Sequence, residues 1–79
     1  MTASEREALI QELLESDPAF RRLHDEHADC KRRIEELNHR SLLSQDDEAE
    51  EKKIKLHKLA LKDQMEALLR QAAAARVAV

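Results

Sequence analysis

Residues 20–37 read FRRLHDEHADCKRRIEEL, and one set of mostly apolar side chains recurs there at alternating spacings of three and four. That rhythm places a narrow stripe along one side of an α-helix, the seam by which helices pack lengthwise on each other. The stripe consists of Phe20, Leu23, His27, Cys30, Ile34 and Leu37. The segment therefore predicts a long amphipathic helix whose seam faces another helix.

A second stripe of the same kind follows in the C-terminal half of the chain. Its members are Ile54, Lys58, Leu61, Met65, Leu68 and Ala72. Read in opposite directions, the two stripes match position by position, from 34 with 54 to 20 with 68, as in a chain that folds back at residue 44. The sequence thus predicts an antiparallel helical hairpin of the coiled-coil type. We expect its seam to consist of Phe20, Leu23, His27, Cys30, Ile34, Ile54, Leu61, Met65 and Leu68.

The composition favours an all-α fold. The 79 residues include no glycine, tryptophan or tyrosine and a single proline, and 39% of them are charged. Turns and strands need glycine, proline or β-branched residues, whereas long helices are typical of this mixture. A bare two-helix layer of this size buries little surface. We therefore expect a single helical-hairpin domain over residues 1–79 that gains stability by assembling into a helical bundle.

Capping signals indicate where the helices begin. Ser4 and Glu7 have the spacing of a capping box near the N-terminus, and Ser44 and Asp47 have it near the turn. An acidic run follows Ser44 and is favourable at the positive end of a helix dipole. We expect helices over about 5–15, 18–42 and 46–75, and a turn over about 41–47.

The only proline separates the first helix from the second. Pro18 cannot donate a backbone hydrogen bond, so the chain must break or kink there, and Asp17 suits the N-cap of the next helix. The apolar rhythm nevertheless stays in phase across the break, from Leu9 and Leu13 to Phe20. We therefore expect a short, proline-kinked N-terminal helix that bends the arm and does not reverse it.

The third helix has a second apolar face. On a helical wheel Leu61 and Met65 cluster with Ile54, whereas a second group lies on nearly the opposite side. That group consists of Leu56, Leu59, Ala60 and Ala67. We predict that the second face contacts another copy of the chain, as a dimer that forms a four-helix bundle. A different protein as partner, or leucines that are simply exposed, are the alternatives.

Two blocks of the sequence resemble a known family. The first is residues 17–23, DPAFRRL, followed by His27 and Ile34, and the second is residues 55–65, KLHKLALKDQM. Over about residues 15–69 the chain is similar to the YdcH-like family of small bacterial proteins. The resemblance implies a helical hairpin of unknown function that forms coiled-coil-like assemblies in the bacterial cytoplasm, with no catalytic residues. The family tends to have leucine where this chain has Cys30, which indicates a packing role for that residue.

One group of side chains has the chemistry of a metal or redox site. His24, His27 and Cys30 stand three residues apart, and zinc takes imidazole and thiolate ligands. On a straight helix, however, they spread over about a third of the circumference, too widely for one ion. Cys30 also pairs with Lys58, and nearby positive charge makes a thiol more reactive. A thiol- or metal-responsive regulator is therefore one alternative, although we expect packing residues and no cofactor.

The second helix is basic. Its cationic residues are Arg21, Arg22, Lys31, Arg32, Arg33 and Arg40. No aromatic residue alternates with them and acidic residues interrupt them, whereas nucleic-acid surfaces combine basic and stacking side chains. Weak nucleic-acid binding is therefore the second alternative, and we expect salt links with the acidic third helix instead.

The remaining features argue against catalysis and against a membrane. The chain has no glycine-rich phosphate loop and no nucleophile with an ordered partner. A single cysteine fits a reducing compartment, and no segment approaches the roughly 20 apolar residues that span a bilayer. We expect a non-enzymatic cytoplasmic protein that serves as a self-associating interaction or scaffold module.

Overall fold

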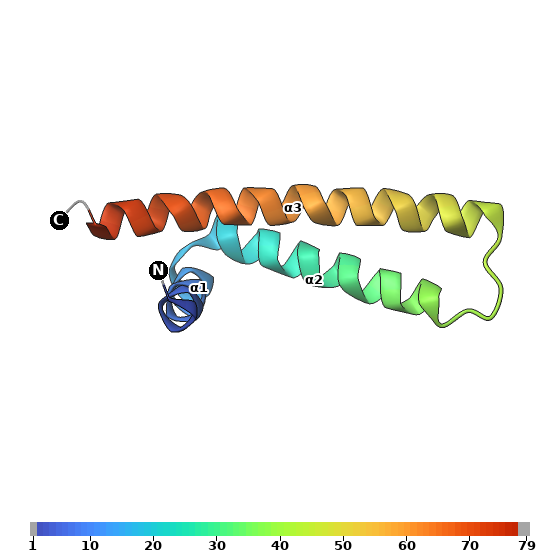
Figure 1. Cartoon of the computed structure of the whole chain (residues 1–79), viewed down its shortest axis with the longest axis horizontal. Coiled ribbons are helices and arrows are strands. Elements are labelled where there is room, and N and C mark those ends of the chain that lie inside the picture. Colours follow the sequence, from blue (N-terminus) through green and yellow to red (C-terminus); the bar gives the residue numbers. More distant parts are fainter. Residues whose placement is uncertain (1, 78–79) are drawn as a thin grey trace.

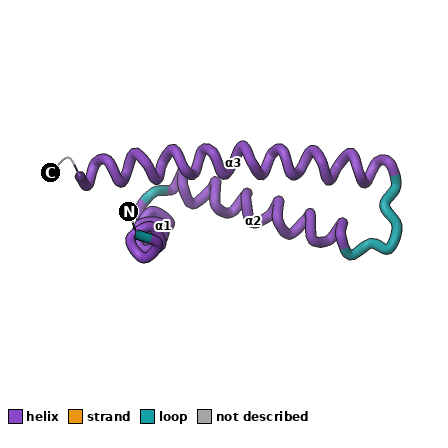
Figure 2. Tube along the Cα trace, viewed as in Figure 1, coloured by secondary structure: helices purple, strands orange, loops and turns teal. Residues whose placement is uncertain are grey.

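The computed structural model describes residues 2–77, which form three helices (Figure 1). Helix α1 spans Ala3–Ser16, α2 spans Pro18–Asn38 and α3 spans Gln45–Val77. Helices α2 and α3 lie side by side and run in opposite directions, and no strand occurs in the part of the chain that the structure describes (Figure 2). The all-α fold and the antiparallel hairpin that the sequence predicts are confirmed.

One buried cluster holds the half of the hairpin nearest the turn. Cys30, Ile34 and Leu37 of α2 are buried against Ile54 and Leu61 of α3. Each comes from the predicted stripes, so the rhythm of three and four residues positions this core directly. Leu23 and Leu43 pack against it and are partly buried.

A second buried cluster brings all three helices together. Leu9 of α1, Phe20 of α2 and Leu69 of α3 form its centre, and Phe20 has no exposed surface. Figure 1 looks along α1 while α2 and α3 lie across the view, so α1 crosses the hairpin and does not extend α2. The chain changes direction at Asp17 and Pro18, where the sequence predicts a kink. The bend is sharp enough to bring α1 into contact with α3.

The joint between α1 and α2 is one residue long. Asp17 has extended backbone angles, φ −118° and ψ 102°, which the residue before a proline favours. Its carboxylate accepts hydrogen bonds from the N–H groups of Ala19 at 3.0 Å and Phe20 at 3.2 Å. Asp17 and Pro18 therefore cap α2 as the sequence predicts.

The N-terminal cap differs from the expected one. The hydroxyl of Thr2 accepts a hydrogen bond from the N–H of Glu5 at 3.1 Å, and α1 begins at Ala3. The prediction that Ser4 caps this helix with Glu7 is wrong, because Thr2 is the N-cap and accepts from one of the first-turn N–H groups, and Ser4 lies inside the helix. Glu7 instead accepts a hydrogen bond from Gln11 at 3.3 Å.

The turn occupies residues 39–44 and ends in the predicted capping box. The Ser44 N–H donates to Asp47 at 3.2 Å, and the Asp47 N–H donates to the Ser44 hydroxyl at 3.1 Å. Helix α2 ends at Asn38, earlier than the expected end near residue 42. The longer connection lets Leu43 return to the core while Leu42 is 88% exposed.

Candidate interaction surface

Helix α3 presents an apolar face that the rest of residues 2–77 leaves largely uncovered. Leu56 is 60% exposed and Leu59 is 59% exposed, and Ala60 beside them is exposed as well. Ala67, further along the helix, is half-buried. We call Leu56, Leu59, Ala60 and Ala67 the outer face.

The outer face is open because α2 covers only the opposite side of α3. Ile54, Leu61 and Leu69 are buried at 5%, 2% and 5% exposure and point toward α2 and α1. Leu56 and Leu59 occur between these positions in the sequence, so the helical period turns them away. The structure therefore gives α3 one occupied apolar face and one vacant one.

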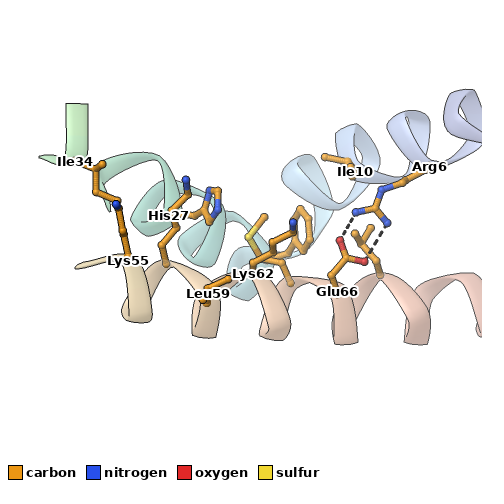
Figure 3. Close-up of a pocket in the computed structure, with 12 residues that line it drawn as sticks. Arg6, Ile10, His27, Ile34, Lys55, Leu59, Lys62 and Glu66 are labelled. Carbon is orange, nitrogen blue, oxygen red and sulfur yellow. Dashed lines mark hydrogen bonds and ion pairs between the residues drawn. The ribbon is translucent and has the colours of Figure 1, made fainter. Parts of the chain in front are cut away.

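A groove lies next to the outer face and shares Leu59 with it (Figure 3). Its volume is about 610 Å³. All three helices contribute apolar side chains to it: Ile10, Phe20, Ile34, Leu59, Met65 and Leu69. Cationic or titratable side chains also line it, namely Lys55, Lys58, Lys62 and His27. The groove is thus apolar within and basic at its rim.

An ion pair closes one end of this groove. The guanidinium of Arg6 donates to both carboxylate oxygens of Glu66, and the Nη1–Oε2 distance is 3.1 Å (Figure 3). The hydrogen bond from Arg6 lowers the pKa of Glu66, and the same contact raises the pKa of Arg6. Neither residue stands out in the sequence, because no spacing rule connects positions so far apart.

His27 lies half-buried along the groove. Burial is the largest cause that lowers the pKa of His27, and the positive charges of Lys58 and Lys62 and the neighbouring His24 lower it further. Both the burial of the imidazole and the neighbouring positive charges thus favour its neutral form at this seam position.

The structure does not assemble His24, His27 and Cys30 into one site. Cys30 is 5% exposed inside the core, whereas His24 is half-buried with its Nδ1 3.7 Å from a carboxylate oxygen of Asp25. Within residues 2–77 no group of three or more histidine, cysteine or acidic side chains is arranged to hold a metal ion. Cys30 fills a core position between the helices.

Much of the basic charge on α2 is paired. Arg33 contacts Glu50 and Arg40 contacts Asp47, each at 2.8 Å, and both pairs join α2 or its end to the acidic start of α3. Arg32 lies 3.3 Å from Asp29 within α2. The other cationic positions, Arg21, Arg22 and Lys31, are exposed. The hairpin therefore uses part of its basic arm for the salt links that the sequence suggests.

The residues of the predicted seam are buried to different extents. Phe20, Cys30 and Ile34 are buried, as are Ile54 and Leu61. The half-buried members are Leu23, His27, Met65 and Leu68. Three further buried residues, Leu9, Leu37 and Leu69, lie outside the nine seam residues that the paired stripes select. Leu69 is buried more deeply than Leu68, since Leu9 of α1 packs beside it, while Leu68 packs at the edge of the same cluster.

These features define a small three-helix protein in which a helical hairpin carries an unoccupied apolar face. The chain belongs to the family described as protein of unknown function (DUF465), whose profile matches residues 20–69. The resemblance to YdcH-like proteins is consistent with that family. No curated protein and no solved structure is a significant match.

The matched span begins at Phe20 and ends at Leu69, so it covers most of the hairpin and leaves out α1 and the last part of α3. In the chain described by the structure, no helix is both long and apolar enough to cross a membrane.

Proposed function

We propose that this protein is a non-enzymatic, self-associating interaction module of the bacterial cytoplasm. In this proposal the hairpin is the structural unit and the outer face of α3 binds a second copy. The two hairpins then form a four-helix assembly with the two α3 helices at its centre and one α2 on each side. A scaffold role for other proteins would then depend on the assembled form.

The exposure of Leu56 and Leu59 is the observation that carries the proposal. Each side chain leaves more than half of its surface in water, although both lie in the middle of a regular helix. Burying a leucine that is otherwise exposed stabilises an assembly by roughly 2 kcal/mol. Two such residues from each copy, next to the small Ala60, would form a contact that stabilises the small hairpin.

The two alternatives have less support. Cys30 is buried among apolar side chains, which limits its access to oxidants or metals. On the basic arm, Arg33 and Arg40 are engaged by Glu50 and Asp47, which reduces the charge available to phosphates. We therefore do not extend the proposal to thiol or metal sensing, or to nucleic-acid binding.

The test is the molar mass in solution, measured by light scattering across a dilution series with reductant present. The chain has a mass of 9.1 kDa, and we expect twice that mass over the upper part of the series. The variant Leu56→Glu with Leu59→Glu should have the mass of one chain. Its circular dichroism should still show the helices, because glutamate is a good helix former.

Leu42→Glu is the matched control. Leu42 is the most exposed of the large apolar residues at 88%, but it lies in the turn and outside the outer face. It should leave the mass unchanged. A wild-type protein that remains a single chain at every concentration would refute self-association.

A further inference from the structure

The charges that flank Leu56 and Leu59 have a self-complementary order. Lys52, Leu56, Leu59 and Asp63 follow one another at spacings of four, three and four residues, which is the rhythm of a helix-packing seam. Both charged residues are exposed. Within residues 2–77 neither Lys52 nor Asp63 forms an ion pair.

This order distinguishes between the two directions in which a second α3 can lie. In an antiparallel arrangement with a two-fold axis between Leu56 and Leu59, each Leu56 meets the other Leu59. Each Lys52 then meets the other Asp63, and the symmetry forms this pair twice. In a parallel arrangement Lys52 would face Lys52 and Asp63 would face Asp63, which is unfavourable.

The residues beside the seam agree with the antiparallel arrangement. Ala60 and Ala67 lie on one flank, and their small side chains let two helices approach closely there. Lys55 and Lys62 lie on the other flank and would approach their counterparts, but Glu51 contacts Lys55 at 2.7 Å, and its negative charge offsets part of the repulsion. The close contact therefore forms on the alanine side, with the lysines toward solvent.

We propose that the occupant of the outer face is a second copy of this chain, bound antiparallel through α3, with Lys52 of each copy paired to Asp63 of the other. The inference rests on the proposed self-association and adds its direction and register. The ion pairs exclude the parallel arrangement and shifted registers, while the leucines supply most of the contact area.

Charge exchange tests the register. Lys52→Asp alone and Asp63→Lys alone each replace two attractions by two repulsions and should raise the dimer dissociation constant about tenfold. The double variant should recover wild-type affinity to within about threefold. An equal mixture of the two single variants should form a mixed dimer, because all its pairs are again opposite in charge.

Lys31→Asp is the control, since it makes the same charge change at an exposed position of α2, away from the outer face of α3. It should leave the dissociation constant unchanged. Circular dichroism of every variant checks that the hairpin is intact.

Cross-linking tests the direction independently. In a Cys30→Ala background, Lys52→Cys and Asp63→Cys should form a disulfide-linked dimer only when the two are mixed and oxidised, because each cysteine then lies opposite the other. A parallel dimer would instead cross-link each variant with itself.

The outcomes separate the two levels of the proposal. A wild-type dimer that Leu56→Glu with Leu59→Glu dissociates, but that the charge exchanges do not affect, would overturn the register and leave self-association standing. Cross-linking of each cysteine variant alone would overturn the antiparallel direction. A wild-type protein that never dimerises would overturn both.

Discussion

The carboxylate of Glu66 accepts hydrogen bonds from both terminal nitrogens of the Arg6 guanidinium, and this contact joins α3 to α1 across 60 residues of sequence. A two-point pair of this kind fixes orientation as well as distance. Because the two side chains remain 45% and 32% exposed, the pair contributes little to the overall stability. The pair links α1 to α3 at the place where the two helices cross.

A double-mutant cycle measures this contact. Arg6→Ala and Glu66→Ala should each lower the free energy of unfolding slightly, and the coupling between them should be about 0.5 kcal/mol. Urea unfolding at low and high salt provides the values, and the coupling should shrink at high salt. Additive effects of the two substitutions would show that the contact does not stabilise the folded protein.

Leu69 should contribute more to the free energy of unfolding than its neighbour Leu68. Leu69 is 5% exposed and packs with Leu9 and Phe20, whereas Leu68 is half-buried. Leu69→Ala should therefore cost about 3 kcal/mol of unfolding free energy, and Leu68→Ala clearly less. Chemical denaturation of the two variants side by side is the measurement. The reverse order would contradict the packing of α1 on this side of α3.

The difference between Leu69 and Leu68 also shows which part of the core can be predicted from the sequence. The period of the two stripes fixes the helices, their antiparallel pairing and the buried positions near the turn, such as Cys30, Ile34 and Ile54. It carries no information about a third helix, because pairing two stripes treats the seam as having two sides only. The selection of Leu69 over Leu68 depends on α1, whose direction is decided by the backbone at Asp17.

The surface features can be divided in the same way, into those that a single helix determines and those that need several helices. The vacant face of Leu56 and Leu59 can be predicted from the helical wheel, since a single helix determines it. The groove cannot be predicted in this way, because Ile10, Phe20 and Met65 come from three helices. They meet only when α1 lies across the hairpin. The pair of Arg6 and Glu66 likewise arises from tertiary packing.

The capping box at the start of α3 should be worth a measurable amount of stability. The Ser44 hydroxyl accepts a hydrogen bond from the N–H of Asp47, and the N–H of Ser44 donates to the Asp47 carboxylate. Ser44→Ala removes one half of this exchange and should lower the free energy of unfolding by about 1 kcal/mol. Ser41→Ala, in the same turn, is the control and should have no effect. Equal losses from the two substitutions would argue against the cap.

The stability of the hairpin should fall on mild acidification because of His27. Its pKa is lowered in the folded protein, mainly by burial, so the unfolded chain takes up a proton at a higher pH than the folded chain does. This contribution is complete above the unfolded pKa of about 6.5 and is lost as the pH falls below that value, until the folded form is protonated too.

Denaturation between pH 7.5 and pH 5 tests this expectation. His27→Gln should reduce the pH dependence in that window, whereas His39→Gln, at the exposed end of α2, should retain it. A slope in the His27→Gln variant equal to that of the wild type would assign the effect to other groups.

The two buried clusters also differ in how much chain must be closed to form them. Leu37 and Ile54 meet across a short turn, whereas Leu9 and Leu69 come from opposite ends of the chain. Closing the longer loop costs more conformational entropy, and it is rewarded only after α3 lies along α2. Folding should therefore start at residues 39–44 and extend outward, with α1 docking last. Pulsed hydrogen exchange would detect this order as early protection of α2 and α3 beside the turn and late protection of α1, so the docking of the N-terminal helix sets the time at which the chain becomes fully native.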